Sequence, residues 1–530
     1  MNGHGERNIR LRIKRLAGMP ARIRFLLLLA GVILAVMWIV PQTAYMATSG
    51  NGPGGVGMTG GGSTLELWLR ADKGVFSDSG CSTVAADGNS VGCWQDQSGN
   101  LAHAKQQSAI GLPSYDNDTN PLNGHPVLNF VAGQVLVTDP AHLISLGALT
   151  VFTVFNAEIG NEGIVYEHNN RVATPDGSNL FTSDACTITV DRGGAETTKS
   201  LLPEWAADGE FRIVTQAYNG DHASHTIAIN NAQPDFEASP CASDPGLGLP
   251  GTDTLDAPVY IGARAGGLYG IQGNIAELIF FNEDLPAVQK ILVENYLSSK
   301  YNIAFDPAST NDHYDGDTPA NGDFDLDVAG IGRFGGVSHT EAQAAGMVLV
   351  NGTFLNSDGD WLLFGHNVST NGNTTSLLPT ASPWDTAPAP ARWGRSWYID
   401  VTDAGNNGGT VNITFDFNEG GMGNFTPSDA DPSNYRLIKR SAIGNPYTDV
   451  AGASSVDVPN KRVTFTGVDV TVLGSDFTLG TLDNNNSPTA VSLQHPISIA
   501  TQPGGLVVVA ACVLTLGLGS LWICLRNRPE

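Results

Sequence analysis

The chain has 530 residues, of which 27 are basic and 52 acidic, giving a formal net charge of −25. Such an acidic surface repels phosphate backbones, so we expect no binding to nucleic acid. The length allows two or three domains. The abundance of glycine and of short β-branched runs, with few helical patterns, predicts an all-β protein.

The N-terminal segment carries seven basic residues and then an uncharged apolar run at residues 25–40. This pattern is typical of an export signal, and the small residues Ala44 and Ala47 loosely fit a cleavage site. We therefore assign residues 1–47 to a signal peptide or, alternatively, a retained signal anchor. A Gly-rich linker is expected at residues 48–62.

A second uncharged apolar run, residues 506–525, is long enough to cross a bilayer as a helix, although a buried core helix is the alternative. Arg526 and Arg528 follow it and predict a short cytoplasmic tail at 526–530. A polar linker at 483–505 leads into this transmembrane helix. Gly504 and Gly505 also resemble part of a tail that sorting proteases remove. The sequence therefore predicts an exported, single-pass cell-surface protein.

Four cysteines lie in the part predicted to be exported, where the environment is oxidising. An even number favours two disulfides, which we predict as Cys81–Cys93 and Cys186–Cys241. Cys512 and Cys524 lie inside the second apolar run and are expected to act as small apolar residues.

Short alternating segments separated by turns predict strands at 65–69, 126–130, 149–155, 211–215, 225–229, 259–262 and 274–281, and a strand end that runs into a turn at 93–100. Strands at this spacing are typical of two packed sheets. One helix is predicted at 285–300, with Asp284 as N-cap and Pro286 in the first turn. An apolar stripe along it indicates packing on the outside or edge of the sandwich; its members are Val288, Ile291, Leu292 and Tyr296.

Several spaced motifs carry a resemblance to a known module. They are residues 67–75 (LWLRADKGV), the pattern around Trp94, Asp96 and Ser98, residues 122–128 (LNGHPVL), residues 273–278 and the following helix. Together they resemble the laminin-G-like (concanavalin A-like) jelly-roll module of bacterial surface proteins over residues 63–305. The resemblance implies an all-β jelly-roll sandwich.

A second set of motifs lies at residues 327–333, 359–367, 393–397, 433–437 and 477–480. It resembles an uncharacterised β-sandwich domain that follows the jelly roll in many bacterial envelope proteins. We therefore expect an acidic linker at 306–320 and a second antiparallel β-sandwich at 321–482. This resemblance implies a fold and no activity.

No catalytic constellation is visible in the sequence. Glycosidases need two carboxylates across a sugar cleft, and the compact acidic strand motif of laminarinase-like relatives does not occur. Asp96 heads a turn, where aspartate is common for hydrogen-bonding reasons. His222 and His225 have no visible third metal ligand, and His366 is expected to be structural. We expect no enzymatic activity and no bound cofactor other than calcium.

Two acidic clusters are candidates for calcium binding. One comprises Asp312, Asp315 and Asp317, and the other Asp323, Asp325 and Asp327. Calcium takes six to eight oxygen ligands, and aspartates at alternate positions can converge on one ion. If the second set formed a strand, the three side chains would emerge on one side. A solvated linker between the domains is the alternative.

Sugar binding is the leading function by analogy of fold alone, with an extracellular glycan or another surface protein as partner. A purely structural spacer is the alternative, and a glycoside-active enzyme a second one. Trp68, Trp94 and Trp361 lie in apolar contexts that indicate core positions. Other aromatics are better placed for sugar contact, in loops or at strand ends: Tyr166, Trp205, Tyr218 and Tyr269.

Overall fold

The structure is a computed structural model. It describes residues 51–60, 63–106, 111–117, 122–131, 133–144, 148–158, 163–169, 177–183, 187–192, 195–200, 209–219, 226–232, 257–264, 266–367, 372–419 and 430–484. The predicted signal or anchor at 1–47, the transmembrane helix at 506–525 and the Cys186–Cys241 pair lie outside these residues. Among the described residues, no helix is both long and apolar enough to cross a membrane.

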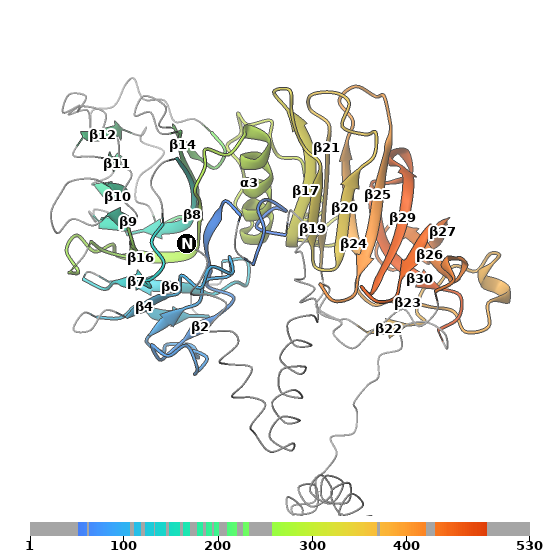
Figure 1. Cartoon of the computed structure of the whole chain (residues 1–530), viewed down its shortest axis with the longest axis horizontal. Coiled ribbons are helices and arrows are strands. Elements are labelled where there is room, and N and C mark those ends of the chain that lie inside the picture. The colour runs from blue at the N-terminus through green and yellow to red at the C-terminus, as the bar shows by residue number, and fades with distance from the viewer. Residues whose placement is uncertain are drawn as a thin grey trace, which may run out of the picture. The chain divides into compact units, whose positions relative to one another are not determined.

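The first sandwich consists of two antiparallel sheets (Figure 1). One sheet has the order β14-β13-β8-β16-β6-β5, and β1 also pairs with β16. Its strands are β1 (Leu65–Arg70), β5 (Ser114–Asp116), β6 (Val127–Phe130), β8 (Leu149–Ala157), β13 (Arg212–Tyr218), β14 (Thr226–Ile229) and β16 (Gly273–Phe281).

The other sheet of this sandwich has the order β12-β11-β10-β9-β15-β7-β4-β3-β2. Its strands are β2 (Val75–Phe76), β3 (Cys93–Trp94), β4 (Ala104–Gln106), β7 (Leu136–Thr138), β9 (Gly163–Asn169), β10 (Gly177–Ser183), β11 (Thr187–Arg192), β12 (Ala195–Ser200) and β15 (Val259–Ile261). Trp94, Phe130 and Phe280 are fully buried in the core between the two sheets.

The second sandwich also has two antiparallel sheets. The larger contains β17 (Leu326–Phe334), β18 (Val337–His339), β21 (Trp361–His366), β22 (Asn373–Thr374), β23 (Ala391–Trp393), β24 (Trp397–Thr402), β26 (Tyr435–Arg440), β27 (Thr448–Gly452) and β30 (Ser475–Thr481). The smaller contains β19 (Glu341–Ala344), β20 (Met347–Asn351), β25 (Thr410–Asp416), β28 (Ser455–Asp457) and β29 (Arg462–Asp469). Short 3-10 turns occur at Trp384–Thr386, Pro432–Asn434 and Val470–Val472. The described chain is therefore all-β apart from α3 and these turns, as the sequence predicted.

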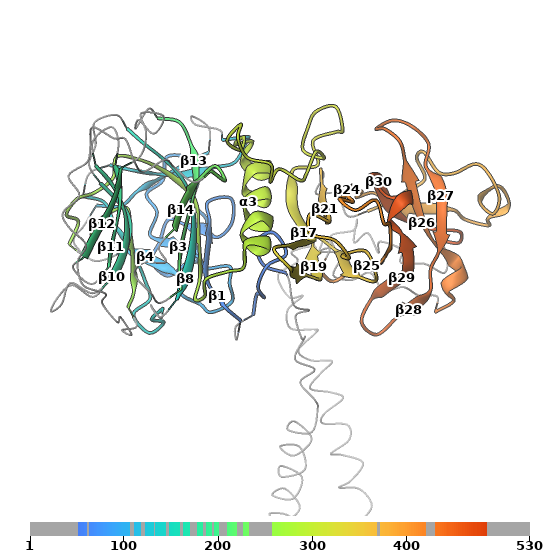
Figure 2. The same ribbon diagram turned by 90° about the horizontal axis from the view of Figure 1, so that it is seen from above.

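Helix α3 (Ala287–Tyr301) lies between the first sandwich and strand β17 of the second (Figures 1 and 2). Strand β16 is buried at all nine positions, because its Leu278 and Phe280 face the sandwich core while Ile279 and Phe281 belong to the cluster around α3. The same cluster includes Trp361 of the second sandwich. The helix thus packs on the outside of the first sandwich, as the sequence predicted, and the second sandwich covers its other side.

The N-terminus of α3 differs from the prediction. The N-cap is Pro286, and the structure shows no side-chain cap there. Asp284 instead accepts a hydrogen bond from Nζ of Lys290 at 2.6 Å. The predicted apolar stripe is buried, but so are the polar residues Glu294 and Asn295. Polar positions that would face water on an isolated helix are therefore also covered.

Two segments expected to be linkers are packed. Residues 52–56 are buried, and the carbonyl of Gly54 accepts a hydrogen bond from the Gly330 amide at 3.2 Å. At Gly54, φ is +68°, and an added Cβ would lie 2.7 Å from the carbonyl oxygen of Leu292 in α3. Only glycine fits this left-handed, crowded position without strain. In the acidic segment, Tyr314 is buried and donates to the carbonyl of Phe324 at 2.7 Å.

Candidate functional site

The structure spreads the predicted calcium ligands of the second set over different surroundings. Strand β17 begins only at Leu326, so Asp323 and Asp325 precede it and the expected strand alternation does not apply. Asp323 is exposed and left-handed at φ 52°. Asp325 accepts from Nδ2 of Asn123 at 2.9 Å, and Asp327 accepts from Nε2 of His366 at 3.1 Å. These contacts give Asp325 and Asp327 separate partners, and Asp323 faces solvent.

The first set is closer together. Burial raises the pKa of Asp317 to about 6, and the charges of Asp312 and Asp315 add to this rise. The Asp315 amide donates to Oδ2 of Asp400 at 2.7 Å. Within the described part of the chain, no group of three His, Cys, Asp or Glu side chains is arranged to hold a metal. Calcium binding by either set stays a prediction.

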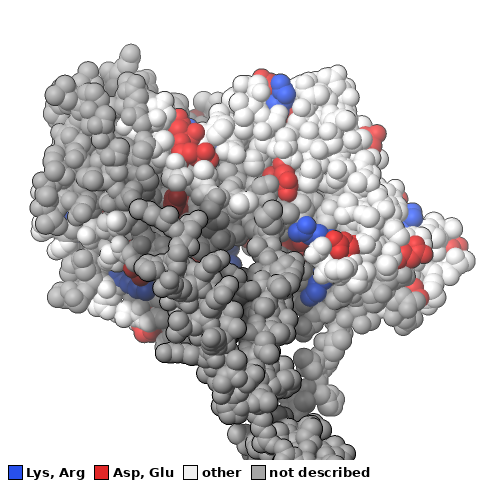
Figure 3. Space-filling model, viewed as in Figure 1, with Lys and Arg blue, Asp and Glu red and all other residues white. Residues whose placement is uncertain are grey.

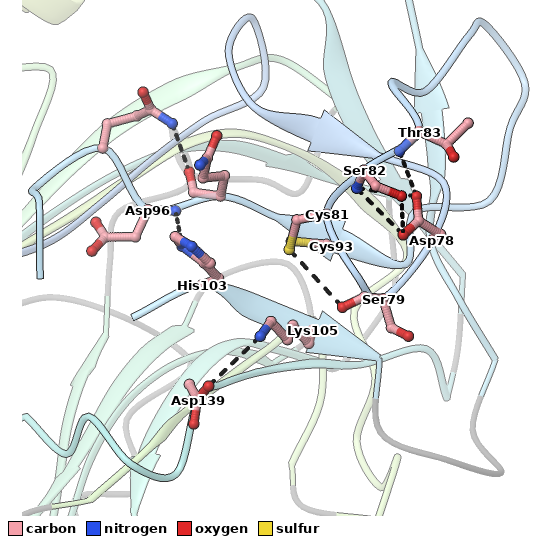
Figure 4. Close-up of a disulfide and its surroundings, with 12 residues drawn as sticks. Asp78, Ser79, Cys81, Ser82, Thr83, Cys93, Asp96, His103, Lys105 and Asp139 are labelled. Atoms are coloured by element: carbon pink, nitrogen blue, oxygen red, sulfur yellow. Dashed lines mark hydrogen bonds and ion pairs between the residues drawn. A yellow bond between two sulfur atoms is a disulfide. The ribbon is translucent and has the colours of Figure 1, made fainter. Parts of the chain in front are cut away.

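The predicted Cys81–Cys93 disulfide is present, with the two Cα atoms 5.4 Å apart (Figure 4). It joins the loop after β2 to the start of β3. Asp96, two residues beyond β3, is buried and accepts hydrogen bonds from the amides of Trp68, Ser98 and Ala102 at 2.9–3.1 Å. Its carboxylate therefore organises the turn, as its sequence context suggested.

The aromatic residues divide differently from the sequence prediction. Trp68, Trp94 and Trp361 are buried, as expected. Tyr166 and Tyr218, however, are almost fully buried, because the strands β9 and β13 turn them into the first sandwich. Tyr269 is 56% exposed and lies in a loop. Trp205 lies outside the described residues.

A cleft of about 370 Å³ opens where the first sandwich, α3 and the second sandwich meet. The described residues belong to one compact unit, so all the walls of the cleft belong to the same body. The walls hold one tryptophan, several amide side chains and charges of both signs. Their polar and aromatic members are Asn51, Thr59, Trp68, Arg70, Lys73, Gln97, Tyr296, Asp327, Gln343, Arg395 and Glu419.

The floor of the cleft is fixed by a buried carboxylate, Glu277 of β16. Its Oε1 accepts from Nε1 of Trp68 at 2.6 Å and from the Tyr296 hydroxyl at 2.9 Å. Its Oε2 accepts from Nζ of Lys300 and the Tyr301 hydroxyl, both at 2.7 Å. Four donors therefore satisfy the hydrogen-bonding capacity of this fully buried carboxylate. Their hydrogen bonds hold β1 and β16 against α3.

This network continues to the second sandwich. Lys300 also reaches Asp72 at 3.0 Å, and Asp72 holds Arg70 in a two-point contact at 3.0 and 2.7 Å. Arg70 then faces Asp327 of β17 at 3.6 Å, and Asp327 accepts from His366. Burial by itself would raise the pKa of Asp72, but Lys300 and Arg70 outweigh it and hold that pKa well below its usual range.

The charges at the rim differ in character from those on the floor. The Glu419 carboxyl is desolvated, which raises its pKa to about 7, and Asp327 adds to that rise. The Gly346 amide donates to Glu419, and Arg395 donates from Nη1 to the Ala345 carbonyl at 2.6 Å. Lys73 is exposed, although desolvation together with the charge of Arg70 lowers its pKa. On the face shown in Figure 3, acidic and basic side chains form small separate groups among uncharged residues.

The sequence matches no protein-family model and none of the curated proteins. Among solved structures, domain 4 of the GH43 extracellular arabinanase AbnA from Geobacillus stearothermophilus, in complex with arabinotriose, is 12% identical with a TM-score of 0.28. That match covers 42% of this chain and 94% of the other. The Ruminococcus gnavus IT-sialidase CBM40, bound to α2,3 sialyllactose, is 13% identical with a TM-score of 0.21, over 28% and 82% of the two chains.

A third similar structure is the native heptameric SAP-like pentraxin from Limulus polyphemus. It is 15% identical with a TM-score of 0.23, over 32% of this chain and 80% of the other. Scores and identities this low carry no argument about function. These matches assign no residue of this chain to a binding site.

Sequence reasoning found neither the cleft nor most of its lining. Lys73 was visible only as part of the family-like motif at 67–75, and Arg395 only beside two tryptophans. Gln343 and Glu419 carried no signal, since single polar residues at strand ends are common. The one usable hint was the concentration of tryptophan and arginine in both motif sets.

Proposed function

We propose that this chain is a cell-surface, membrane-anchored protein that binds carbohydrate in the cleft between its two sandwiches. The observation that carries the proposal is the composition of the cleft. Amide side chains of Asn51, Gln97 and Gln343 line it beside Trp68. Amides offer both donors and acceptors, which suits a ligand covered with hydroxyl groups.

The size of the cleft supports the same function. Sites for small molecules commonly measure about 300–1,000 Å³, and about 370 Å³ lies near the lower end. This volume suits a short glycan segment rather than a long chain. Trp68 is only 8% exposed and has the Arg70 guanidinium 5.2 Å above its ring, so it offers an edge rather than a stacking platform.

The proposed location at the cell surface and the proposed membrane anchor come from the sequence. The laminin-G-like resemblance of residues 63–305 fits a module that presents a binding surface outside the cell. The proposal takes the apolar run at 25–40 as an export signal and the run at 506–525 as an anchor, which would hold that surface outside the cytoplasmic membrane. The proposal includes no catalytic step. In the cleft, Asp327 accepts a hydrogen bond from His366 and faces Arg70.

The test is glycan binding by the full-length chain purified in detergent. Gln97→Ala removes a cleft amide, and we expect binding to weaken about two- to tenfold, the usual worth of one hydrogen bond. Gln106→Ala, at an exposed position of β4, is the matched control and should bind like the parent chain. Intact cells that display the chain should bind the same glycans from outside. If no glycan bound, the spacer alternative would replace the proposal.

A further inference from the structure

The cleft departs from the charge of the rest of the chain. Acidic residues outnumber basic ones by 52 to 27 over the whole sequence. In the cleft lining, basic residues outnumber acidic ones. The basic residues are Arg70, Lys73 and Arg395, and the acidic residues are Asp327 and Glu419. An excess of cationic side chains in a concave site attracts an anionic ligand even when the surrounding surface is acidic.

The three cations are not equivalent. Arg70 is held by Asp72 and faces Asp327, so most of its charge is already compensated. Lys73 is exposed, and within the described residues its side chain makes no hydrogen bond or ion pair. Its position is set by the turn after β1, where its amide donates to the Arg70 carbonyl at 3.2 Å. The ammonium group of Lys73 can therefore reach a ligand without breaking a contact.

Arg395 contributes from the opposite wall. It lies between β23 and β24, is buried, and has one guanidinium nitrogen fixed on the Ala345 carbonyl. A guanidinium anchored in this way is oriented in advance, which suits recognition of a planar carboxylate. Lys73 and Arg395 thus approach one cleft from the first and second sandwich respectively.

We propose that the cleft binds a sugar residue that carries a carboxylate, with Lys73 and Arg395 as its recognition residues. This inference rests on the proposed function and names the class of glycan. The amides of Gln97 and Gln343 would contact the hydroxyl groups of the same residue.

Glu419 makes this binding depend on pH. The groups that face its carboxyl are the Gly346 amide, Asp327, Asp416, Arg395 and, through its charge, Lys73. Because the pKa of Glu419 is about 7, the carboxyl loses its negative charge as the pH falls from 8 to 6. A sugar carboxylate remains ionised over this range. Binding of an acidic glycan should therefore strengthen as the pH falls, and Glu419→Gln should remove that dependence.

The experiment compares each acidic glycan with its own methyl ester, using the full-length chain in detergent. Suitable probes are a trigalacturonate and sialyllactose, because esterification removes the charge and keeps the sugar. We expect the acid to bind about tenfold more tightly than the ester, as one charge-assisted hydrogen bond provides. Lys73→Gln should remove most of this difference. Lys105→Gln is the matched control, since Lys105 pairs with Asp139 at 3.6 Å and does not line the cleft.

The outcomes separate the two proposals. Acid and ester binding equally tightly would overturn the inference while leaving glycan binding in the cleft intact. Loss of the acid preference in Lys105→Gln as well as Lys73→Gln would also overturn it, because the effect would then follow net charge. If neither form of any probe bound, both the inference and the proposed function would fall.

Discussion

Replacing Lys300 with methionine is the sharpest test of how the first sandwich is joined to α3. Nζ of Lys300 lies 2.7 Å from Glu277 and 3.0 Å from Asp72, and its side chain is 2% exposed. Removing one partner of a buried ion pair costs about 3–5 kcal/mol, because the other charge stays buried. Glu277 would keep three neutral donors, so we expect the lower end, about 3 kcal/mol.

The assay is equilibrium urea unfolding of the full-length chain, followed by tryptophan fluorescence. Lys290→Met is the matched control on the same helix. Lys290 pairs with Asp284 at 2.6 Å but is 23% exposed, and such partly exposed pairs contribute about 0–1 kcal/mol. If Lys300→Met cost no more than Lys290→Met, the buried network would not stabilise the fold as described.

A double-mutant cycle with Glu277→Gln extends the same test. The two side chains are in direct contact, so their effects should not add. The double variant should be more stable than the sum of the single losses predicts, by about 1 kcal/mol or more. Strict additivity would show that the two groups do not interact in solution.

Two further predictions concern the packed glycine segment and a buried carboxyl. Gly54→Ala should lower the melting temperature by several degrees more than Gly88→Ala, which has a similar φ of +73° but open space at Cβ; equal losses would contradict the packing against α3. Burial raises the pKa of Glu294 to about 6 from 4.5, so the folded state holds its proton more tightly than the unfolded chain. Stability should therefore fall by about 2 kcal/mol as the pH rises from below 4.5 to above 6. Glu294→Gln should abolish that fall, and an unchanged pH slope would refute this account.

Much of the secondary structure could be predicted because local patterns specify it. Strands β1, β6, β8 and β16 fall where alternation and flanking turns placed them. The short spacing of Cys81 and Cys93 made their pairing predictable. The stripe on α3 was equally local, since helical periodicity places those residues on one face whatever they contact.

The surroundings of these elements could not be predicted in the same way. The sequence indicates loop or strand-end positions for Tyr166 and Tyr218, yet the neighbouring strands bury both side chains in the first core. Glu294 and Lys300 look like solvent-facing helix residues in the sequence. They are buried against the first sandwich, where Glu294 accepts from Thr215 of β13 at 2.6 Å and Lys300 donates to Glu277 of β16 at 2.7 Å. Nothing in the local pattern records these contacts.

By itself, the sequence determined the fold class, the positions of about half of the described strands of the first sandwich, helix α3 and the Cys81–Cys93 pairing. These features depend on residues close together in the chain. The tertiary structure alone decided the cleft, because Lys73, Arg395 and Glu419 share it only after α3 has packed against both sandwiches. A binding site assembled from residues so far apart has no periodic or spacing signal, since its geometry is created by docking rather than by local conformation.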